Sequence, residues 1–273
     1  MATADHDFNA TLTLEPPLPA LPCLAADRVL QLLGVRTTDV TRRRALAILT
    51  ELLETRDGAT RSVCFVNAHT LNLAAADAAY REVLNAADRV FGDGTGVRWA
   101  ARWQGIRLRD NLAGTDLVPQ WLRTTADRGY RYFLVGGEEP IIARAAAVAA
   151  RNFPGWIQAG YHHGYLDDPQ QAARAISQIH RARPDVLLVG MGNPRQECWI
   201  QRYRQQLEVP LCIGVGGLFH YWAGDLHRAP AWLRRCGAEW LGILLQQPHK
   251  ARRYLLGNPL FLWRILRGHG QAS

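Results

Sequence analysis

A glycine-rich turn in the first half of the chain carries a single carboxylate. Residues 92–96 read Gly-Asp-Gly-Thr-Gly and follow a short apolar run, so Asp93 stands among residues that let a ligand approach the backbone closely. A carboxylate in that setting suits general-base chemistry on a hydroxyl group. Asp-Gly pairs also form turns for conformational reasons alone, and the motif by itself leaves both interpretations open.

A second polar turn, residues 190–197, reads Gly-Met-Gly-Asn-Pro-Arg-Gln-Glu and opens a helical pattern. We expect Asn193 to cap this helix, with Pro194 at its first position. The positive end of the helix, its backbone amides and Gln196 would then face a space that favours phosphate. The alternative is a capping box between Asn193 and Gln196, which needs no ligand; the two interpretations are compatible.

Other turns offer weaker signals. Asn67 follows an apolar run and begins a helical stretch, where it either caps the helix or contacts a ligand. Residues 190–193 and 214–217 each resemble half of a dinucleotide fingerprint but lack its third glycine, which leaves an NAD(P)-dependent oxidoreductase as an alternative. A Walker phosphate loop is excluded, because the single lysine, Lys250, lies far from any glycine-rich turn.

Short apolar runs alternate with longer helical patterns along the chain. The apolar runs are 62–67, 89–92, 131–137, 156–160, 185–192 and 211–217, and the helical stretches include 115–128, 139–152, 170–182 and 194–207. This alternation predicts an α/β fold, a Rossmann-like, mostly parallel sheet flanked by helices. Ligands of such sheets bind beyond the carboxyl ends of the strands, where the polar turns fall.

Positive charge is concentrated near the C-terminus. The net charge is +8, and residues 226–273 contain eight Lys and Arg residues against one acid, interleaved with aromatic residues. This composition is typical of a helical segment that binds an anionic membrane surface. The alternatives are a nucleic-acid-binding module and a solvated pair of basic helices whose aromatic residues lie in the core. We expect a disordered tail over 1–24, an α/β core over 25–225 and a basic amphipathic helical appendage over 226–273.

The sequence predicts neither a spanning segment nor a metal site. No apolar run approaches the ~18 residues that a spanning helix needs. The N-terminal residues lack the basic and apolar regions of a secretion signal. The five cysteines form no CxxC pair, which indicates reduced thiols. We therefore expect a cytoplasmic protein that needs no metal and no other cofactor.

A series of short motifs follows in order between residues 29 and 261. They are VNAHTLNLA, GDGTGV, NLAGTDL, FLVGG, HHGYL, GMGNPRQE, GVGGLFHYWAG, RAPAWL, AEWL and PHKARRY. In content and spacing this series resembles the WecG/TagA/CpsF family of glycosyltransferases, which builds bacterial cell-surface polysaccharides.

The resemblance implies an inverting, metal-independent transferase that moves a hexose or N-acetylhexosamine from a UDP-sugar to a polyprenyl-pyrophosphate-linked glycan. It implies Asp93 as the general base, assisted by Gln196. The implied substrate-binding residues are Asn67, Thr95, Asn111, Gly136, Tyr165, Gly192, Asn193, Gly216 and His220, and those at the acceptor pyrophosphate and membrane are Lys250, Arg252 and Arg253. For Tyr165 the alternative is an aromatic residue packed in the core.

The resemblance also implies association with the inner face of the cytoplasmic membrane, and it leaves self-association open. The chain departs from the family pattern at three of its positions. Ile243 stands where the family carries an arginine, His220 where an aspartate is common and Asn111 where many relatives have an arginine. The donor sugar and the contacts to the acceptor can differ accordingly.

Overall fold

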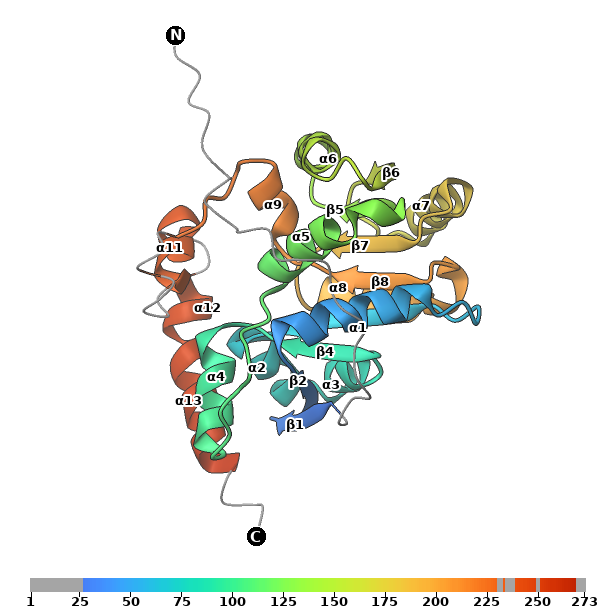
Figure 1. Ribbon diagram of the computed structural model, residues 1–273. Helices are drawn as coiled ribbons and strands as arrows, with labels where there is room; N and C mark the ends of the chain where they lie inside the picture. The colour runs from blue at the N-terminus through green and yellow to red at the C-terminus, as the bar shows by residue number, and fades with distance from the viewer. Residues whose placement is uncertain (1–26, 230–232, 234–238, 249–250, 269–273) are drawn as a thin grey trace.

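The computed structural model describes residues 27–229, 233, 239–248 and 251–268 of the 273-residue chain. Its centre is an eight-stranded sheet in the order β1-β2-β4-β3-β8-β7-β5-β6 (Figure 1). The strands are β1 Arg28–Leu32, β2 Val35–Asp39, β3 Arg61–Val66, β4 Arg89–Gly92, β5 Arg131–Gly136, β6 Ile157–His162, β7 Val186–Gly190 and β8 Leu211–Gly214. All neighbouring strands are parallel except β1 and β2, which form an antiparallel hairpin.

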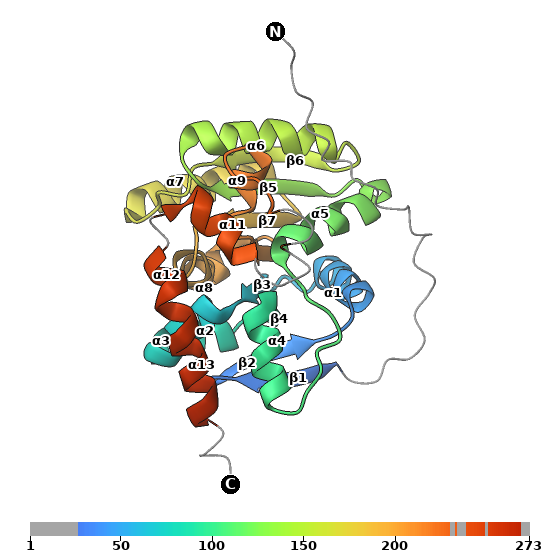
Figure 2. The ribbon, with the colours of Figure 1, turned by 90° about the vertical axis from the view of Figure 1, so that its left-hand side faces the viewer.

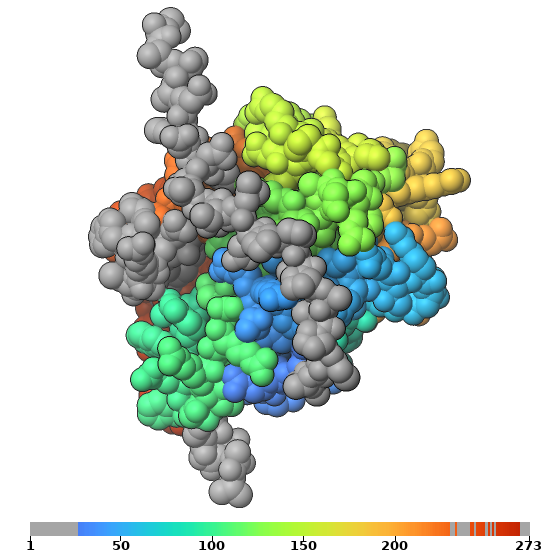
Figure 3. Space-filling model, in the orientation of Figure 1, coloured from blue at the N-terminus to red at the C-terminus, as the bar shows by residue number. Residues whose placement is uncertain are grey.

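Helices cover both faces of the sheet. They are α1 Arg42–Glu54, α2 Ala68–Ala76, α3 Ala78–Asn85, α4 Gly94–Trp103, α5 Gly114–Thr124, the 3₁₀ helix η1 Ala126–Arg128, α6 Glu139–Asn152, α7 Pro169–Ala182, α8 Arg195–Leu207 and α9 Leu218–Trp222. Towards the C-terminus follow α11 Glu239–Gln246, α12 Ala251–Leu255 and α13 Gly257–Gly268. In space-filling view, the residues of β1, β2 and α4 make up the lower part of the molecule, and those of β5 and α6 the upper part (Figure 3).

Alternating residues of the central strands divide the core between the two faces. Val63 and Phe65 of β3 pack with the buried residues of α1, α5, α6 and α9. Cys64 and Val66 of the same strand pack instead with α2, α3, α4 and α13. Because both faces of β3 are covered, its sequence is a continuous apolar run and not an alternating one.

The predicted fold class is confirmed, and each of the six predicted strands is present with boundaries that differ by a few residues. The prediction missed the N-terminal hairpin of β1 and β2. Its turn residues, Leu33 and Gly34, both have positive φ (50° and 81°), as two-residue hairpin turns require. The hairpin gave a weak signal because β2 reads Val-Arg-Thr-Thr-Asp, in which polar residues dominate a strand that is nevertheless mostly buried.

The last helix of the chain packs onto the core. Phe261 and Ile265 of α13 are buried in the same cluster as Leu71 of α2 and Val97 of α4. The Asn72 side chain of α2 donates a hydrogen bond to the Gly257 carbonyl (2.7 Å), at the start of α13. Figure 2 shows α13 lying beside α4 and in front of α2. The division at residue 225 stays a prediction, and the expected tail over 1–24 lies outside the described residues.

No helix in the described part of the chain is both long enough and apolar enough to cross a bilayer.

Candidate active site

The parallel strands bring the predicted polar turns to one edge of the sheet. Asp93 follows β4, Asn67 follows β3, Gly216 follows β8, Gly192 follows β7 and Gly136 ends β5. The strand order places these five positions along the carboxyl edge in the order just given. Neighbouring strands lie about 4.8 Å apart, so three intervals, or about 14 Å, separate the ends of β4 and β7.

Asp93 occupies the N-cap position of α4 and is half-buried. Its backbone amide donates to the Val66 carbonyl of β3 (2.8 Å), which fixes the turn against the neighbouring strand. The next amide, of Gly94, donates to Oδ1 of Asn111 (2.6 Å). Gly94 has φ +90°, a conformation that favours glycine. The Asp93 side chain makes no capping bond to α4, and the backbone contacts on either side fix the turn that carries it.

Asn111 therefore supports the turn that carries the candidate base. Its side-chain oxygen accepts from the Gly94 amide, and its amide NH₂ group can donate to a substrate. Thr95 lies in the first turn of α4 and is half-buried, with its hydroxyl 3.5 Å from the Arg98 guanidinium.

Asn67 caps α2, which was one of its two predicted interpretations. Its Oδ1 accepts hydrogen bonds from the backbone amides of His69 (3.0 Å) and Thr70 (3.2 Å). The amide NH₂ of Asn67 is the group left for a ligand. The starts of α2 and α4 approach closely, because a side chain at Gly96 would lie 2.8 Å from Cβ of Ala68. This close packing puts Asn67 and Asp93 on adjoining helix ends.

The turn after β7 differs from its predicted form. Pro194 is the N-cap residue of α8 and the helix begins at Arg195, so the predicted Asn193 cap with Pro194 at the first helical position is wrong. The Asn193 side chain donates to Oε1 of Glu197 (2.5 Å) instead of accepting from the helix amides. The predicted capping box with Gln196 is absent for the same reason. Gly192, with φ +78°, precedes this turn, and the helix still starts at the carboxyl edge.

Gln196 and Glu197 form a buried polar network, and each is only 1% exposed. Nε2 of Gln196 donates to Oε1 of Glu197 (2.7 Å), and Oε1 of Gln196 accepts from the Gly216 amide (3.0 Å). The Tyr80 hydroxyl of α3 donates to the other carboxylate oxygen of Glu197 (3.1 Å). The network thus ties α3 and the start of α8 to the turn after β8.

Burial raises the pKa of Glu197, although hydrogen bonds from Gln196, Asn193 and Tyr80 act in the opposite direction. The contacts of Gln196 support the Gly216 turn, and its predicted role beside Asp93 stays a prediction. Sequence reasoning missed Glu197 and Tyr80. An acid in the first turn of a helix usually faces solvent, and no motif marks Tyr80, so the only available signal was that Glu197 closes the GNPRQE motif.

The end of the edge near β5 carries an exposed aromatic side chain. Gly136 has φ +152°, and a side chain there would lie 2.3 Å from the Gly190 carbonyl oxygen, so β5 and β7 end in close contact. Tyr165 is 50% exposed, which makes the predicted alternative of a core aromatic wrong. Its hydroxyl donates to Glu138 (3.2 Å), and the Arg195 guanidinium lies 6.0 Å from the ring centre. A flat ligand can stack on such a ring.

The remaining predicted residues belong to helices α9 and α12 or lie outside the described residues. His220 is half-buried in α9, and its Nδ1 lies 3.7 Å from the Asp225 carboxylate. Arg252 and Arg253 belong to α12, and Arg253 is half-buried. Lys250 lies outside the described residues.

Among the residues that the structure describes, no three His, Cys, Asp or Glu side chains form a group that could hold a metal ion. The expectation of a metal-independent enzyme stays a prediction.

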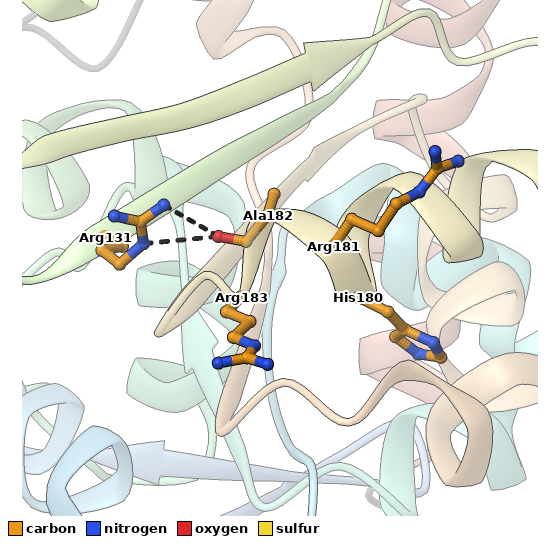
Figure 4. A pocket seen from close by; sticks show the side chains of 5 residues that line it. All are labelled: Arg131, His180, Arg181, Ala182 and Arg183. Carbon is orange, nitrogen blue, oxygen red and sulfur yellow. Dashed lines mark hydrogen bonds between the residues drawn. The ribbon is translucent and has the colours of Figure 1, made fainter.

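A surface hollow lies at the opposite edge of the sheet (Figure 4). It is lined by Arg131 at the start of β5 and by residues 180–183 at the end of α7. The Arg131 guanidinium donates twice to the Ala182 carbonyl (3.3 and 2.9 Å), closing the end of that helix. The hollow contains none of the predicted site residues and lies across the sheet from them.

The family described as "Glycosyl transferase WecG/TagA/CpsF family" matches residues 30–272 of the chain. Curated relatives carry the name N-acetylglucosaminyldiphosphoundecaprenol N-acetyl-beta-D-mannosaminyltransferase. The chain is similar to the Bacillus spizizenii protein, with 34% identity over 71% of this chain and 74% of that protein. The Bacillus subtilis protein is 32% identical over 74% and 77% of the two chains, and the Staphylococcus aureus protein is 30% identical over 74% and 78%.

Proposed function

Because the chain belongs to the WecG/TagA/CpsF family of glycosyl transferases, we propose that it transfers an N-acetylhexosamine from a UDP-sugar to a sugar carried on a polyprenyl diphosphate. This chain matches about three quarters of the length of two relatives that are named for an N-acetylmannosaminyl transfer to such an acceptor. Family membership takes precedence over the two alternatives, an oxidoreductase and a nucleic-acid-binding module.

The observation that best supports this proposal is the order of chemical groups along the carboxyl edge of the sheet. From β4 towards β5 the edge presents a carboxylate, an amide side chain, two glycine turns beside a helix start, and an exposed tyrosine. A nucleotide sugar has the matching linear order of sugar, diphosphate and base. We infer that the sugar lies near Asp93 and Asn67, the diphosphate near Gly216 and Gly192, and the uracil against Tyr165.

Asp93 is proposed as the general base. Its carboxylate would take the proton of the acceptor hydroxyl as that oxygen attacks the anomeric carbon. The bond from this carbon to the β-phosphate oxygen breaks on the opposite side, so the configuration inverts and UDP leaves. The backbone contacts of Asp93 to Val66 and of Gly94 to Asn111 hold the turn that carries the carboxylate in place for this step.

The leaving diphosphate needs positive charge or hydrogen-bond donors. The start of α8 faces the same edge, and a helix N-terminus favours phosphate through its amides and its dipole. Arg195, the first residue of that helix, adds a guanidinium near Tyr165. The network through Glu197 and Gln196 fixes the Gly216 turn, so the turn is already oriented before the donor binds.

The acceptor is proposed to enter from the side of α13, which packs against α2 and α4, and of α12, which contacts α13. A polyprenyl chain stays in the bilayer, so we propose that the enzyme works at the inner face of the cytoplasmic membrane. Lys250, Arg252 and Arg253 remain the proposed contacts to the acceptor diphosphate.

The test compares Asp93→Asn with the parent protein in a UDP-release assay on a UDP-N-acetylhexosamine and a short-chain polyprenyl-diphosphate sugar. Asparagine keeps the shape and loses the base, so we expect kcat to fall roughly 10²- to 10⁴-fold with a smaller change in the donor KM. The control is Asp127→Asn, since Asp127 is an exposed carboxylate of η1, before β5 and therefore at the opposite edge of the sheet. Normal turnover by Asp93→Asn would refute the assignment of the base.

The stereochemistry has a separate measurement. The anomeric configuration of the product sugar, read by NMR coupling constants, should be opposite to that of the donor. Retention would contradict the single displacement while leaving the transfer itself intact.

A further inference from the structure

Two adjoining helices expose large apolar side chains on one face of the molecule. Trp99 and Trp103 of α4 are 57% and 54% exposed. Helix α13, which packs against α4, exposes Leu262, Trp263 and Leu266. Single apolar residues are common on protein surfaces, but a contiguous group of large ones marks an interaction site.

Helix geometry puts the two tryptophans on the α13 side of α4. They are four residues apart and therefore share one stripe of the helix. A side chain at Gly96 would lie 3.5 Å from the Phe261 ring of α13, which fixes the direction in which α13 lies. At 100° per residue, Trp99 and Trp103 point to within about 60° of that direction, whereas Arg98 and Arg102 lie on the far flank.

The corresponding stripe of α13 faces α4. Phe261 and Ile265 point into the core, and the Arg264 guanidinium donates to the Asn72 carbonyl of α2 (2.6 Å), so α2 lies on one side of α13. Leu262 and Leu266 lie on the other side, towards α4. The two stripes therefore join into one apolar strip, and Figure 2 looks directly at the face that carries α4, α12 and α13.

The strip lies among positive charges. Residues 94–109 contain four arginines and no acid, and residues 251–268 also contain four arginines and no acid. Arg98, Arg102 and Arg107 are exposed on the α4 side, and the Arg267 guanidinium lies 4.1 Å from the centre of the Trp263 ring. Tryptophan with arginine suits the boundary between lipid headgroups and acyl chains, where each cation near an anionic surface contributes.

We propose that α4 of the catalytic core and α13 together form one binding face for an anionic phospholipid bilayer, with Trp99 and Trp103 inserted at its surface. This inference deepens the proposed function and depends on it only for the reason why a bilayer is needed. The C-terminal helices are thus not the whole membrane contact. Part of it belongs to the helix that begins directly after Asp93.

The arrangement limits how far the site can lie from the lipid. At 1.5 Å of rise per residue, Trp99 lies about 9 Å along the helix axis from Asp93. A bilayer that holds Trp99 therefore holds the carboxylate within about one sugar-diphosphate length of the headgroups. The acceptor sugar that such a site can reach is the one attached directly to the lipid diphosphate.

The experiment measures co-sedimentation of the full-length protein with vesicles of phosphatidylglycerol and phosphatidylcholine, and with vesicles of phosphatidylcholine alone. Trp99→Ala/Trp103→Ala should bind the anionic vesicles at least roughly tenfold more weakly, because two half-exposed indoles no longer enter the interface. The control is Ile157→Ala/Tyr161→Ala, which removes two exposed apolar side chains from the edge strand β6, and it should bind like the parent protein.

A second readout reports insertion directly. Dibrominated lipids should quench less of the intrinsic fluorescence in Trp99→Phe/Trp103→Phe than in the parent protein, because the indoles nearest the acyl chains are missing. Equal binding and equal quenching in parent and variants would overturn the proposal. So would a loss of self-association, seen by light scattering in the alanine double variant with unchanged vesicle binding, since the occupant would then be a second copy of the chain.

Failure of this inference can be told apart from failure of the proposed function. UDP release with a short-chain acceptor in detergent does not require a bilayer. If the tryptophan variants keep that activity and lose vesicle-dependent activity, both proposals stand. If Asp93→Asn stays active while the tryptophan variants lose vesicle binding, the membrane face stands and the catalytic assignment is wrong.

Discussion

Two substitutions of Glu197, by alanine and by glutamine, test its hydrogen bonds and its charge separately. Three donors meet this carboxylate, from Asn193, Gln196 and Tyr80, and the side chain is 1% exposed. Alanine would leave the buried Gln196 and Tyr80 donors and the half-buried Asn193 donor without their acceptor. At about 1–3 kcal/mol for each such group, partly offset because a buried charge disappears, we expect Glu197→Ala to lower the free energy of unfolding by about 3–5 kcal/mol.

Glutamine should cost far less. Its oxygen can accept from Asn193 and Gln196, and its NH₂ group can donate to the Tyr80 hydroxyl, which rotates to accept. We therefore expect Glu197→Gln to lie within about 1 kcal/mol of the parent protein near neutral pH. The measurement is urea unfolding of the parent and both variants, with Glu208→Gln, an exposed carboxylate at the end of the same helix, as the control.

The pH dependence gives the sharper test. Burial holds the pKa of Glu197 above its ordinary value of 4.5, so the folded state binds this proton more tightly than the unfolded state. The resulting stabilisation is complete below the ordinary value and is lost as the pH rises through the raised pKa. The stability of the parent relative to Glu197→Gln should therefore decrease with rising pH over that interval.

The kinetic constants should also change when the Gly216 turn loses its support. Glu197→Ala frees Gln196, whose oxygen holds the Gly216 amide, so the donor KM should rise more than kcat falls. The reasoning is refuted if alanine and glutamine destabilise equally, or if the difference between parent and Glu197→Gln does not change with pH.

Two further substitutions test the frame around the site. Gly136→Ala should destabilise the protein by several kcal/mol, since the new Cβ would lie 2.3 Å from the Gly190 carbonyl oxygen, whereas Gly105→Ala, also at positive φ but with no atom near its Cβ, should cost only about 1–2 kcal/mol in thermal or urea unfolding. Asn72→Ala removes the side-chain contacts to the first turn of α13 and to Arg264, so we expect limited proteolysis to cleave near α13 faster while near-ultraviolet circular dichroism of the core stays unchanged.

The sequence predicted the site best where strand ends carry residues with few structural alternatives. An asparagine or an aspartate directly after an apolar run indicated Asn67 and Asp93, and the parallel sheet brings both to one edge. The cap of Asn193 could not be predicted in its true form. Its side chain chooses between the helix amides and a carboxylate four residues on, and local sequence allows both.

Burial was harder to predict than secondary structure. Gln196 and Glu197 read as exposed residues of a polar helix start, but a partner from α3, more than 100 positions away in sequence, completes their network. In α4 the sequence suggests too much burial instead of too little. Its pattern Val-Arg-Trp-Ala-Ala-Arg-Trp is one in which buried tryptophans would be expected. The small alanines face the core instead, because close packing against the neighbouring helices leaves no room for an indole.

The proposed site and the proposed membrane face share helix α4, and α13 of that face also packs against α2. Asn67 and Asp93 occupy the N-cap positions of α2 and α4, and α13 contacts both helices through Asn72 and the Gly96 approach. A displacement of α13 on the bilayer would therefore move the two helix ends that carry the candidate sugar and base contacts. Binding to lipid and alignment of the acceptor then become one event, and variants that loosen α13 should reduce transfer on vesicles more than transfer in detergent.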